Sequence, residues 1–256
     1  AADVYRTIYR RKNLFIQAPT GTGKTMSTIY PSVRAVGEGL AEKIFYLTAK
    51  SITATVALDA FRILGGKGYQ AKTVLITAKE KMCVCEEMDC NPQNCPYAEG
   101  HFDRVNDAVF ELLQKEEIFT REIFLEQAHR HRVCPFELCL DTASWADNII
   151  CDYNYVFDPN VYLRRFFAEG TKEEYLFLVD EAHNLVERAR SMYSAVLVKE
   201  DFLAVKKLVK PYSKKVAAEL EKCNKILLAY KRECEDYQIC ENISNFAFAL
   251  MRFGAA

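Results

Sequence analysis

Two short stretches of this chain combine residue types and spacings that suit nucleotide chemistry. The first is the glycine-rich run APTGTGKT at positions 18–25, which follows the phosphate-loop pattern G-x-x-x-x-G-K-[ST] with Ala18 at the first glycine position. Gly21 and Gly23 can adopt backbone angles that turn consecutive N–H groups toward one anion. A helix N-terminus behind the loop would add partial positive charge. The run therefore predicts a phosphate site rather than a glycine turn that happens to precede a lysine.

Two side chains at the end of this loop have specific roles in such a site. Lys24 can reach the β- and γ-phosphates of ATP, and the Thr25 hydroxyl can bind Mg²⁺. The residues of the loop that we expect to bind the nucleotide are Thr20, Gly21, Thr22, Gly23, Lys24 and Thr25.

The second stretch is an acidic pair, Asp180 and Glu181, directly after the apolar run YLFLV at positions 175–179. A nucleotide hydrolase needs a carboxylate at the end of a strand beside the phosphate loop, where it holds Mg²⁺, and Asp180 fits. A carboxylate one residue further on can orient and deprotonate the attacking water, and Glu181 fits. Alternatively, the pair only caps the following helix. Because a phosphate loop lies upstream, we expect Lys24, Asp180 and Glu181 to be the catalytic residues.

The chain has ten cysteines, and its N-terminus lacks the apolar core of a secretion signal, so metal binding is favoured over a disulfide framework. The candidate ligands have the spacing C-x6-C-x4-C-x38-C and are Cys83, Cys90, Cys95 and Cys134. Four thiolates suit either tetrahedral zinc or an iron–sulfur cluster, and the spacing alone does not decide between them. Cys85 lies two residues from Cys83 and is an alternative ligand to it. Cysteines expected to pack as core residues are Cys139, Cys223, Cys234 and Cys240.

The elements that must position these groups alternate between strands and helices over the first 78 residues. Apolar runs predict buried strands at 14–16, 43–48 and 73–76, and helical spacing predicts helices at 25–40 and 51–64. The first helix is expected to break at Pro31 and to end near Gly37 and Gly39. This alternation predicts an α/β fold with an open, parallel sheet.

The pattern changes near residue 79. Residues 79–100 show no strand period, residues 103–128 predict one amphipathic helix or a pair, residues 140–150 look helical and residues 151–157 look extended. The α/β pattern returns with the strand at 175–179, and residues 184–256 then look almost wholly helical. A module inserted into an α/β domain is the natural interpretation.

Composition narrows the class of protein. The net charge is −1, so the chain as a whole is not basic enough to indicate a nucleic-acid partner. A surface that binds nucleic acid must therefore be a local basic patch. No apolar run approaches the length of a membrane span. We therefore expect a cytoplasmic protein with no membrane partner.

The motifs resemble those of a known family. APTGTGKT and DEAH, positions 180–183, look like motifs I and II of superfamily-two helicases, in which alanine commonly fills the first glycine position. The run at 46–61 resembles motif Ia, which touches the DNA backbone. Four further runs look like the iron–sulfur helicases of the XPD and DinG type, namely KEKMC (79–83), CPYA (95–98), CPFELC (134–139) and DYNYVFDP (152–159).

This resemblance implies a domain plan and a set of cofactors. Residues 1–78 and 141–190 would form a RecA-like motor domain, residues 79–140 a [4Fe–4S] insertion, and residues 191–256 part of a helical arch. The four candidate cysteines would hold the cluster, ATP would be the nucleotide, and Thr25 and Asp180 would hold Mg²⁺. His183 would couple hydrolysis to the rest of the motor, although a lone histidine after a strand could equally cap a helix.

The resemblance also implies DNA as partner, as single strands or a single-/double-strand junction, with 5′-to-3′ movement in DNA repair or replication. A local groove for a single strand needs cations and stacking aromatics. The candidates flank Cys134 and the DYNYVFDP segment and are Arg130, His131, Arg132, Tyr153, Tyr155, Phe157, Tyr162, Arg164 and Arg165. Alternatives to the helicase are a zinc-containing nucleic-acid-dependent ATPase and a DNA-binding module without catalysis.

The family motor has two RecA-like halves, and after residue 195 we find no motif III and no second strand–helix domain. We therefore expect this chain to bind nucleotide and DNA weakly but not to unwind a duplex, because the second half that completes the ATP site is missing. A strand-separation assay on a forked duplex checks this, and unwinding at a rate comparable to that of a complete helicase would refute it.

Overall fold

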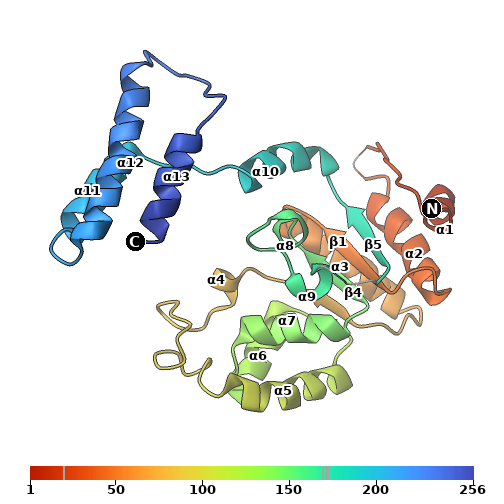
Figure 1. The fold of residues 1–256 in the computed structure, drawn as a ribbon. Helices are drawn as coiled ribbons and strands as arrows, with labels where there is room; N and C mark the ends of the chain where they lie inside the picture. The colour runs from red at the N-terminus through yellow and green to blue at the C-terminus, as the bar shows by residue number, and fades with distance from the viewer. Residues whose placement is uncertain (20, 169, 171–172) are drawn as a thin grey trace. The chain divides into compact units, whose positions relative to one another are not determined.

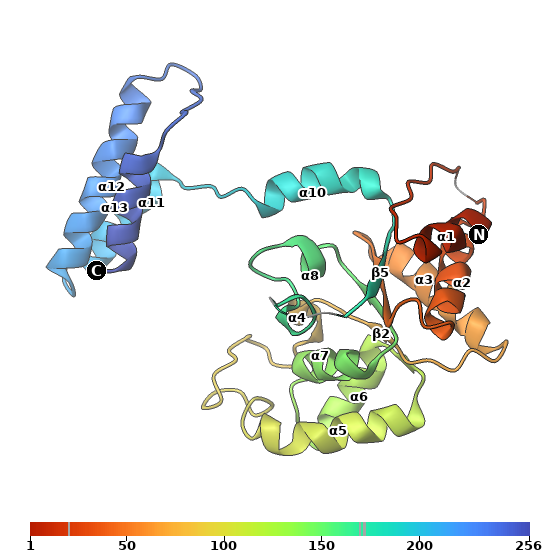
Figure 2. The ribbon, with the colours of Figure 1, turned by 45° about the vertical axis from the view of Figure 1, so that its right-hand side comes forward.

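The computed structural model describes residues 1–19, 21–168, 170 and 173–256, without the side chain of Ser51. The described chain divides into two compact units, Ala1–Tyr193 and Ser194–Ala256, which we treat separately (Figures 1 and 2).

The first unit alternates helices and strands. Its elements are α1 (Ala2–Tyr9), α2 (Lys24–Gly37), β1 (Lys43–Leu47), α3 (Ser51–Gly65), β2 (Thr73–Leu75), α4 (Lys79–Met82), α5 (His101–Lys115), β3 (Ile118–Phe119), α6 (Arg121–His131), α7 (Pro135–Trp145), β4 (Asn148–Cys151), α8 (Asn154–Phe157), α9 (Arg164–Phe167), β5 (Tyr175–Val179), η1 (Ala182–Asn184) and α10 (Leu185–Met192).

Five strands of the described residues form one sheet in the order β3-β2-β4-β1-β5, with every pair parallel. Leu47 of β1 lies opposite Cys151 of β4 and Val179 of β5, so these three strands end at the same level. The predicted α/β fold with an open parallel sheet is confirmed.

Side-chain alternation along β1 sends neighbours to opposite faces of the sheet. Phe45 and Leu47 belong to the larger core, which helices α5 to α9 cover, whereas Tyr46 belongs to a second core under α2 and α3. Strand β1 is buried on both faces, which is typical of a central parallel strand. Its position fixes the carboxyl edge on which the candidate residues lie.

The strand predicted at 14–16 is wrong. These residues, all described, have no regular structure, and the Phe15 side chain is 90% exposed. Among the described strands β5 pairs only with β1, so its outer edge is open and residues 14–16 do not extend the sheet. Without a partner strand, the backbone N–H and C=O groups of these three residues have no inter-strand hydrogen bonds, so the residues form a loop.

The predicted helix at 140–150 and extended segment at 151–157 are also partly wrong. The run Asn148–Cys151 is strand β4 and is fully buried. The prediction missed it because a short apolar run with β-branched residues fits a central strand as well as a helix. Asn154–Phe157 is a helical turn, which the Asp152 carboxylate starts by accepting a hydrogen bond from Asn154 N–H at 2.9 Å. Helix α2 runs through Pro31 unbroken.

Strand β3 was not predicted. It lies between α5 and α6, inside the proposed insertion at 79–140, and pairs with β2. Part of the segment 79–140 therefore belongs to the sheet of the first unit. The proposed domain boundaries stay a prediction.

The second unit is helical, as expected for residues 191–256. It contains α11 (Lys199–Val209), α12 (Lys214–Arg232) and α13 (Ser244–Gly254), packed around Phe202, Leu220 and Phe246. Cys223 is fully buried in this small core, as predicted, whereas Cys234 is only partly buried and Cys240 is exposed, so the core prediction is wrong for Cys240. Across the described residues, none of the helices combines the length and the apolar character needed to cross a bilayer.

Candidate nucleotide site and cysteine cavity

The candidate nucleotide site lies at the carboxyl edge of the sheet. Asp180, the residue after β5, continues the ladder by donating its N–H to the Leu47 carbonyl oxygen at 2.9 Å. Because the register aligns the ends of β1, β4 and β5, the residues that follow each strand meet at one edge. The acidic pair is thus fixed by backbone pairing.

The phosphate loop reaches the same edge. The Lys24 ammonium lies 3.3 Å from Glu181 Oε1, although 157 residues separate the two in sequence. Both side chains are about one-third exposed, so solvent screens the pair. The contact brings the two predicted motifs together, as a nucleotide pocket requires.

The loop has the backbone conformation that the pattern demands. Gly21 and Gly23 have φ of +79° and +73°, a region that residues with a Cβ avoid, and nothing lies within 4 Å of where a Cβ would be. Helix α2 begins at Lys24 with Gly23 as its N-cap. Thr22 donates its hydroxyl to the Pro19 carbonyl at 2.8 Å, which shapes the turn. Predicted Thr20 lies outside the described residues.

Tyr46 lies beside the two expected magnesium ligands. Its hydroxyl is close enough to the Thr25 hydroxyl and the Asp180 carboxylate for both groups to affect its pKa. Burial raises the pKa of Tyr46, and the Asp180 charge raises it further, so the hydroxyl stays protonated. Thr25 and Asp180 therefore face a common point, which suits an oxygen-liganded cation. Tyr46 was missed as a site residue because the sequence offers only a strand aromatic.

Tyr153 holds the backbone of the acidic pair. Its ring is fully buried, and its hydroxyl donates to the carbonyl oxygens of Asp180 and, at 3.3 Å, Glu181. Glu181 has φ of +51°, unusual for a residue with a side chain. We infer that Tyr153 stabilises this conformation and so directs the Glu181 carboxylate toward Lys24.

Two further contacts surround the acidic pair. Arg188 of α10 donates two hydrogen bonds, at 3.0 and 2.9 Å, to the Asp152 carboxylate at the end of β4. His183 is 73% exposed, and its Nδ1 lies 3.4 Å from Glu181 Oε2. The predicted coupling residue therefore contacts the proposed base, from the solvent side.

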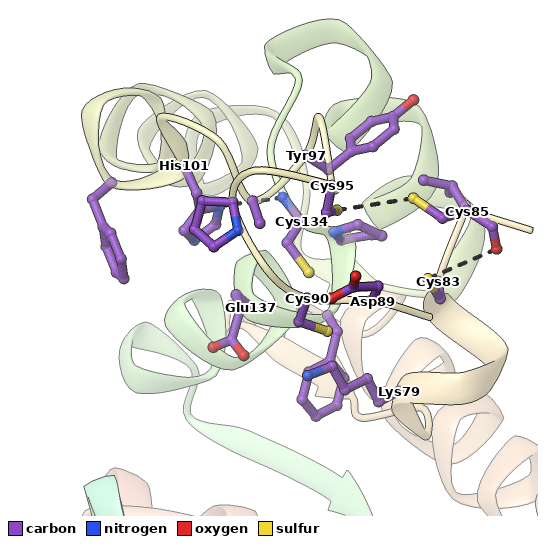
Figure 3. Close-up of a pocket in the computed structure, with 16 residues that line it drawn as sticks. Lys79, Cys83, Cys85, Asp89, Cys90, Cys95, Tyr97, His101, Cys134 and Glu137 are labelled. Atoms are coloured by element: carbon purple, nitrogen blue, oxygen red, sulfur yellow. Dashed lines mark hydrogen bonds between the residues drawn. The ribbon is translucent and has the colours of Figure 1, made fainter. Parts of the chain in front are cut away.

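The predicted cysteine ligands line one cavity of about 310 Å³, and Cys85 lines it too (Figure 3). Cys83 and Cys85 follow α4, Cys90 and Cys95 lie on the next loop, and Cys134 caps α7. A hydrogen bond with Cys90 raises the pKa of Lys79, while burial raises the pKa of Cys134 and raises that of Cys85 to about 11. Thiols from two separate segments, the loop between α4 and α5 and the start of α7, therefore face one space.

The spread of these thiols bears on what they could hold. In the described part of the chain, no three histidine, cysteine or acidic side chains converge closely enough for a single metal ion. The cavity of about 310 Å³ is far larger than one water needs, which is roughly 10–15 Å³ by the same measure, so the thiols line an open space.

His101 supports the cavity and was missed by sequence reasoning. Its ring is buried and accepts a hydrogen bond at Nδ1 from the Cys134 N–H at 3.2 Å. Its Nε2 lies 3.9 Å from Asp141. Burial lowers the pKa of His101, so the neutral ring holds the backbone of Cys134. Cys139, in contrast, is fully buried in the core, as predicted.

Most of the cations expected to contact DNA have carboxylate partners. Arg130 and His131 both contact Glu111, at 2.7 and 2.6 Å, and Arg165 contacts Asp141 at 2.9 Å. Arg164 lies over the Tyr162 ring at 5.8 Å. The predicted basic groove is therefore less positive than its sequence suggests.

Comparison with known proteins gives a consistent picture. The DEAD_2 family model matches residues 67–202, more than half of the chain. A Caenorhabditis briggsae protein named regulator of telomere elongation helicase 1 homolog is 25% identical over 227 residues, 71% of this chain and 22% of its own length. The Kluyveromyces lactis ATP-dependent DNA helicase CHL1 is 25% identical over 134 residues, 52% of this chain and 16% of its own length.

A solved structure titled truncated XPD has a TM-score of 0.60 at 17% identity, and the match covers 99% of this chain and 73% of that one. At this identity the likeness supports the fold alone. The chain spans about a fifth of the length of the curated relatives it matches.

Replacing Tyr153 by phenylalanine tests its role. We expect Tyr153→Phe to lower the free energy of unfolding by about 1 kcal/mol, because two partly buried carbonyl oxygens lose their donor. We also expect it to weaken nucleotide binding in the presence of Mg²⁺ more than in its absence, because Asp180 is displaced. Urea unfolding and nucleotide titrations with and without Mg²⁺ measure both effects. Tyr212→Phe, at a 90% exposed side chain, is the matched control; equal behaviour of the two variants would contradict the role.

Proposed function

Since the chain belongs to the DEAD_2 family, and relatives that it matches are named DNA helicases, we propose that it is the ATP-binding part of an ATP-dependent DNA helicase. One observation carries the proposal: Lys24 of the glycine-rich loop contacts Glu181 after β5. This contact joins a phosphate-binding loop to a pair of carboxylates, which is the arrangement that nucleotide hydrolysis requires.

Each residue of the site has a distinct role in this proposal. The backbone N–H groups around Gly21 and Gly23, together with the N-terminus of α2, bind the phosphates. Lys24 leaves Glu181 and pairs with the β- and γ-phosphates, and Glu181 is then free to accept a proton from the attacking water. Thr25 and Asp180 would hold Mg²⁺, which supplies charge neutralisation on the phosphate oxygens. Thr20, Thr22 and His183 remain proposed nucleotide contacts.

We assign the cysteine cavity to a [4Fe–4S] cluster held by Cys83, Cys90, Cys95 and Cys134. The single cavity that all four thiols line supports the assignment. The Cys134 sulfur sits at the N-terminus of α7, where backbone N–H groups partly offset the rise in its pKa that burial causes. His101 fixes the Cys134 backbone and so orients this ligand.

The remaining parts of the proposal concern the longer protein. DNA, single-stranded or at a junction, is the proposed partner, and a second RecA-like domain completes the ATP site. The 5′-to-3′ direction, the role in repair, the boundaries 1–78 with 141–190, 79–140 and 191–256, and a cytoplasmic location all remain predictions.

Two substitutions at the Lys24–Glu181 contact should change nucleotide affinity in opposite directions. Lys24→Ala should weaken binding of ATP by about tenfold or more, because a charge-assisted hydrogen bond contributes about 1.5–3 kcal/mol. Glu181→Gln should bind ATP more tightly than the wild type, since Lys24 no longer has to leave a carboxylate, while losing any hydrolysis. Fluorescent-nucleotide titration and phosphate release measure these effects.

Lys67→Ala is the matched control, because this exposed lysine follows α3 at the opposite edge of the sheet. Nucleotide affinity that is unchanged in Lys24→Ala would overturn the site. DNA binding without any nucleotide binding would favour the module that lacks catalysis.

Metal content tests the cluster. Protein purified without air should show a broad absorption band near the violet end of the visible spectrum and contain about four irons per chain. Cys134→Ser should lose most of both, whereas Cys240→Ser, in the second unit, should keep them. Colourless protein with one zinc per chain would overturn the cluster and leave the nucleotide site intact.

A further inference from the structure

The cysteine cavity has one thiol more than the proposed cluster uses. Five cysteines line it, and Cys85 is the one without an assigned role. Its sulfur lies 3.9 Å from the sulfur of Cys95, a proposed ligand, and Figure 3 shows the two side chains turned toward each other. We propose that, when the cavity holds no metal, Cys85 and Cys95 are oxidised by peroxide to a disulfide, which blocks metal loading until it is reduced.

The geometry permits this bond. A disulfide needs its sulfurs about 2.05 Å apart, so the pair must close by less than 2 Å. Neither residue lies in a helix or strand, because residues 83–100 form turns and bends between α4 and α5. Rotation about the side-chain bonds and a small shift of this loop can therefore bring the sulfurs together. Both thiols are partly exposed, so a small oxidant can reach them.

The chemistry balances with hydrogen peroxide as the oxidant. The Cys95 thiolate attacks a peroxide oxygen, the O–O bond breaks, and a Cys95 sulfenic acid and hydroxide form. The Cys85 thiol then attacks the sulfenic sulfur, an S–S bond forms, and the sulfenic oxygen leaves as water with the thiol proton. In sum, two thiols and one peroxide give one disulfide and two waters. A dithiol reductant reverses the bond by exchange through a mixed disulfide.

The bond would have two consequences. It removes Cys95 from the set of available thiolates, so the cavity can no longer supply four ligands from its assigned residues. It also protects Cys95 from further oxidation to the sulfinic acid, which is irreversible for most proteins. The cavity would then be a reversible redox-sensitive site, which depends on Cys95 being a ligand but not on whether the metal is iron or zinc.

The experiment uses the full chain, freed of metal by a chelator under reducing conditions and then transferred to buffer without thiols. One equivalent of hydrogen peroxide is added, free thiols are counted, and peptides are mapped by mass spectrometry. We expect a loss of two thiols per chain and a cross-linked peptide pair containing Cys85 and Cys95. Co²⁺ then serves as the probe of free thiolates, read by its thiolate charge-transfer absorption.

Wild-type protein should lose most of its Co²⁺ binding after peroxide and regain it after a dithiol. Cys85→Ser should bind Co²⁺ before peroxide and keep most of that binding afterwards. Cys240→Ser, an exposed cysteine in the second unit, should behave as the wild type. Circular dichroism, with Cys85→Ala as a second variant, checks that the substituted chains fold.

Several results would overturn the proposal. A disulfide that joins other cysteines, or equal loss of Co²⁺ binding in Cys85→Ser and the wild type, would remove Cys85 from this role. Folded Cys85→Ser that binds no Co²⁺ before peroxide would make Cys85 a ligand instead. These readouts need neither nucleotide nor iron. A failure of this proposal can therefore be told apart from a failure of the proposed helicase function.

Discussion

The hydrogen bond from the Asp180 N–H to the Leu47 carbonyl is the constraint on which the nucleotide site depends. It extends the β1–β5 ladder one residue past the strand and thereby fixes where the acidic pair begins. A parallel sheet aligns the carboxyl ends of its strands, so one register decides which side chains meet. A shift of β5 by one residue would turn the Asp180 side chain away from Tyr46 and Thr25.

The two candidate sites are connected by a short path through the fold. Cys134 is the N-cap of α7, α7 leads into β4, and Asp152 and Tyr153 follow β4. Tyr153 holds the backbone of the acidic pair, and Asp152 binds Arg188 of α10. The two candidate sites are therefore linked by one continuous stretch of chain, from Cys134 to Tyr153.

Charge at the surface is arranged differently from what the sequence suggests. Glu111 contacts Lys115, Arg130 and His131, and these contacts hold the pKa of its carboxyl well below the usual range. The carboxylate therefore stays ionised and neutralises cations that a sequence count assigns to DNA. Affinity for a polyanion at this face would depend on whether phosphates compete with Glu111 for the same cations.

The sequence by itself predicted those parts of the protein whose conformation depends on consecutive residues. The phosphate loop needs glycines at two positive-φ positions followed by a lysine, and the strand before the acidic pair needs an apolar run, so both could be predicted. Strand β4 could not be predicted, because the four residues NIIC fit a buried strand or a helix until their neighbours are known. The strand predicted at residues 14–16 is wrong because an apolar run forms a strand only when another strand pairs with it.

Tertiary structure alone decided the contacts between distant residues. Register and packing decide four such contacts: Lys24 with Glu181, Tyr46 beside Thr25 and Asp180, Tyr153 with the carbonyl oxygens of the acidic pair, and the 3.9 Å between the sulfurs of Cys85 and Cys95. Sequence spacing carries no information on such distances, because the chain between these residues can fold back in many ways until the sheet and its cores select one.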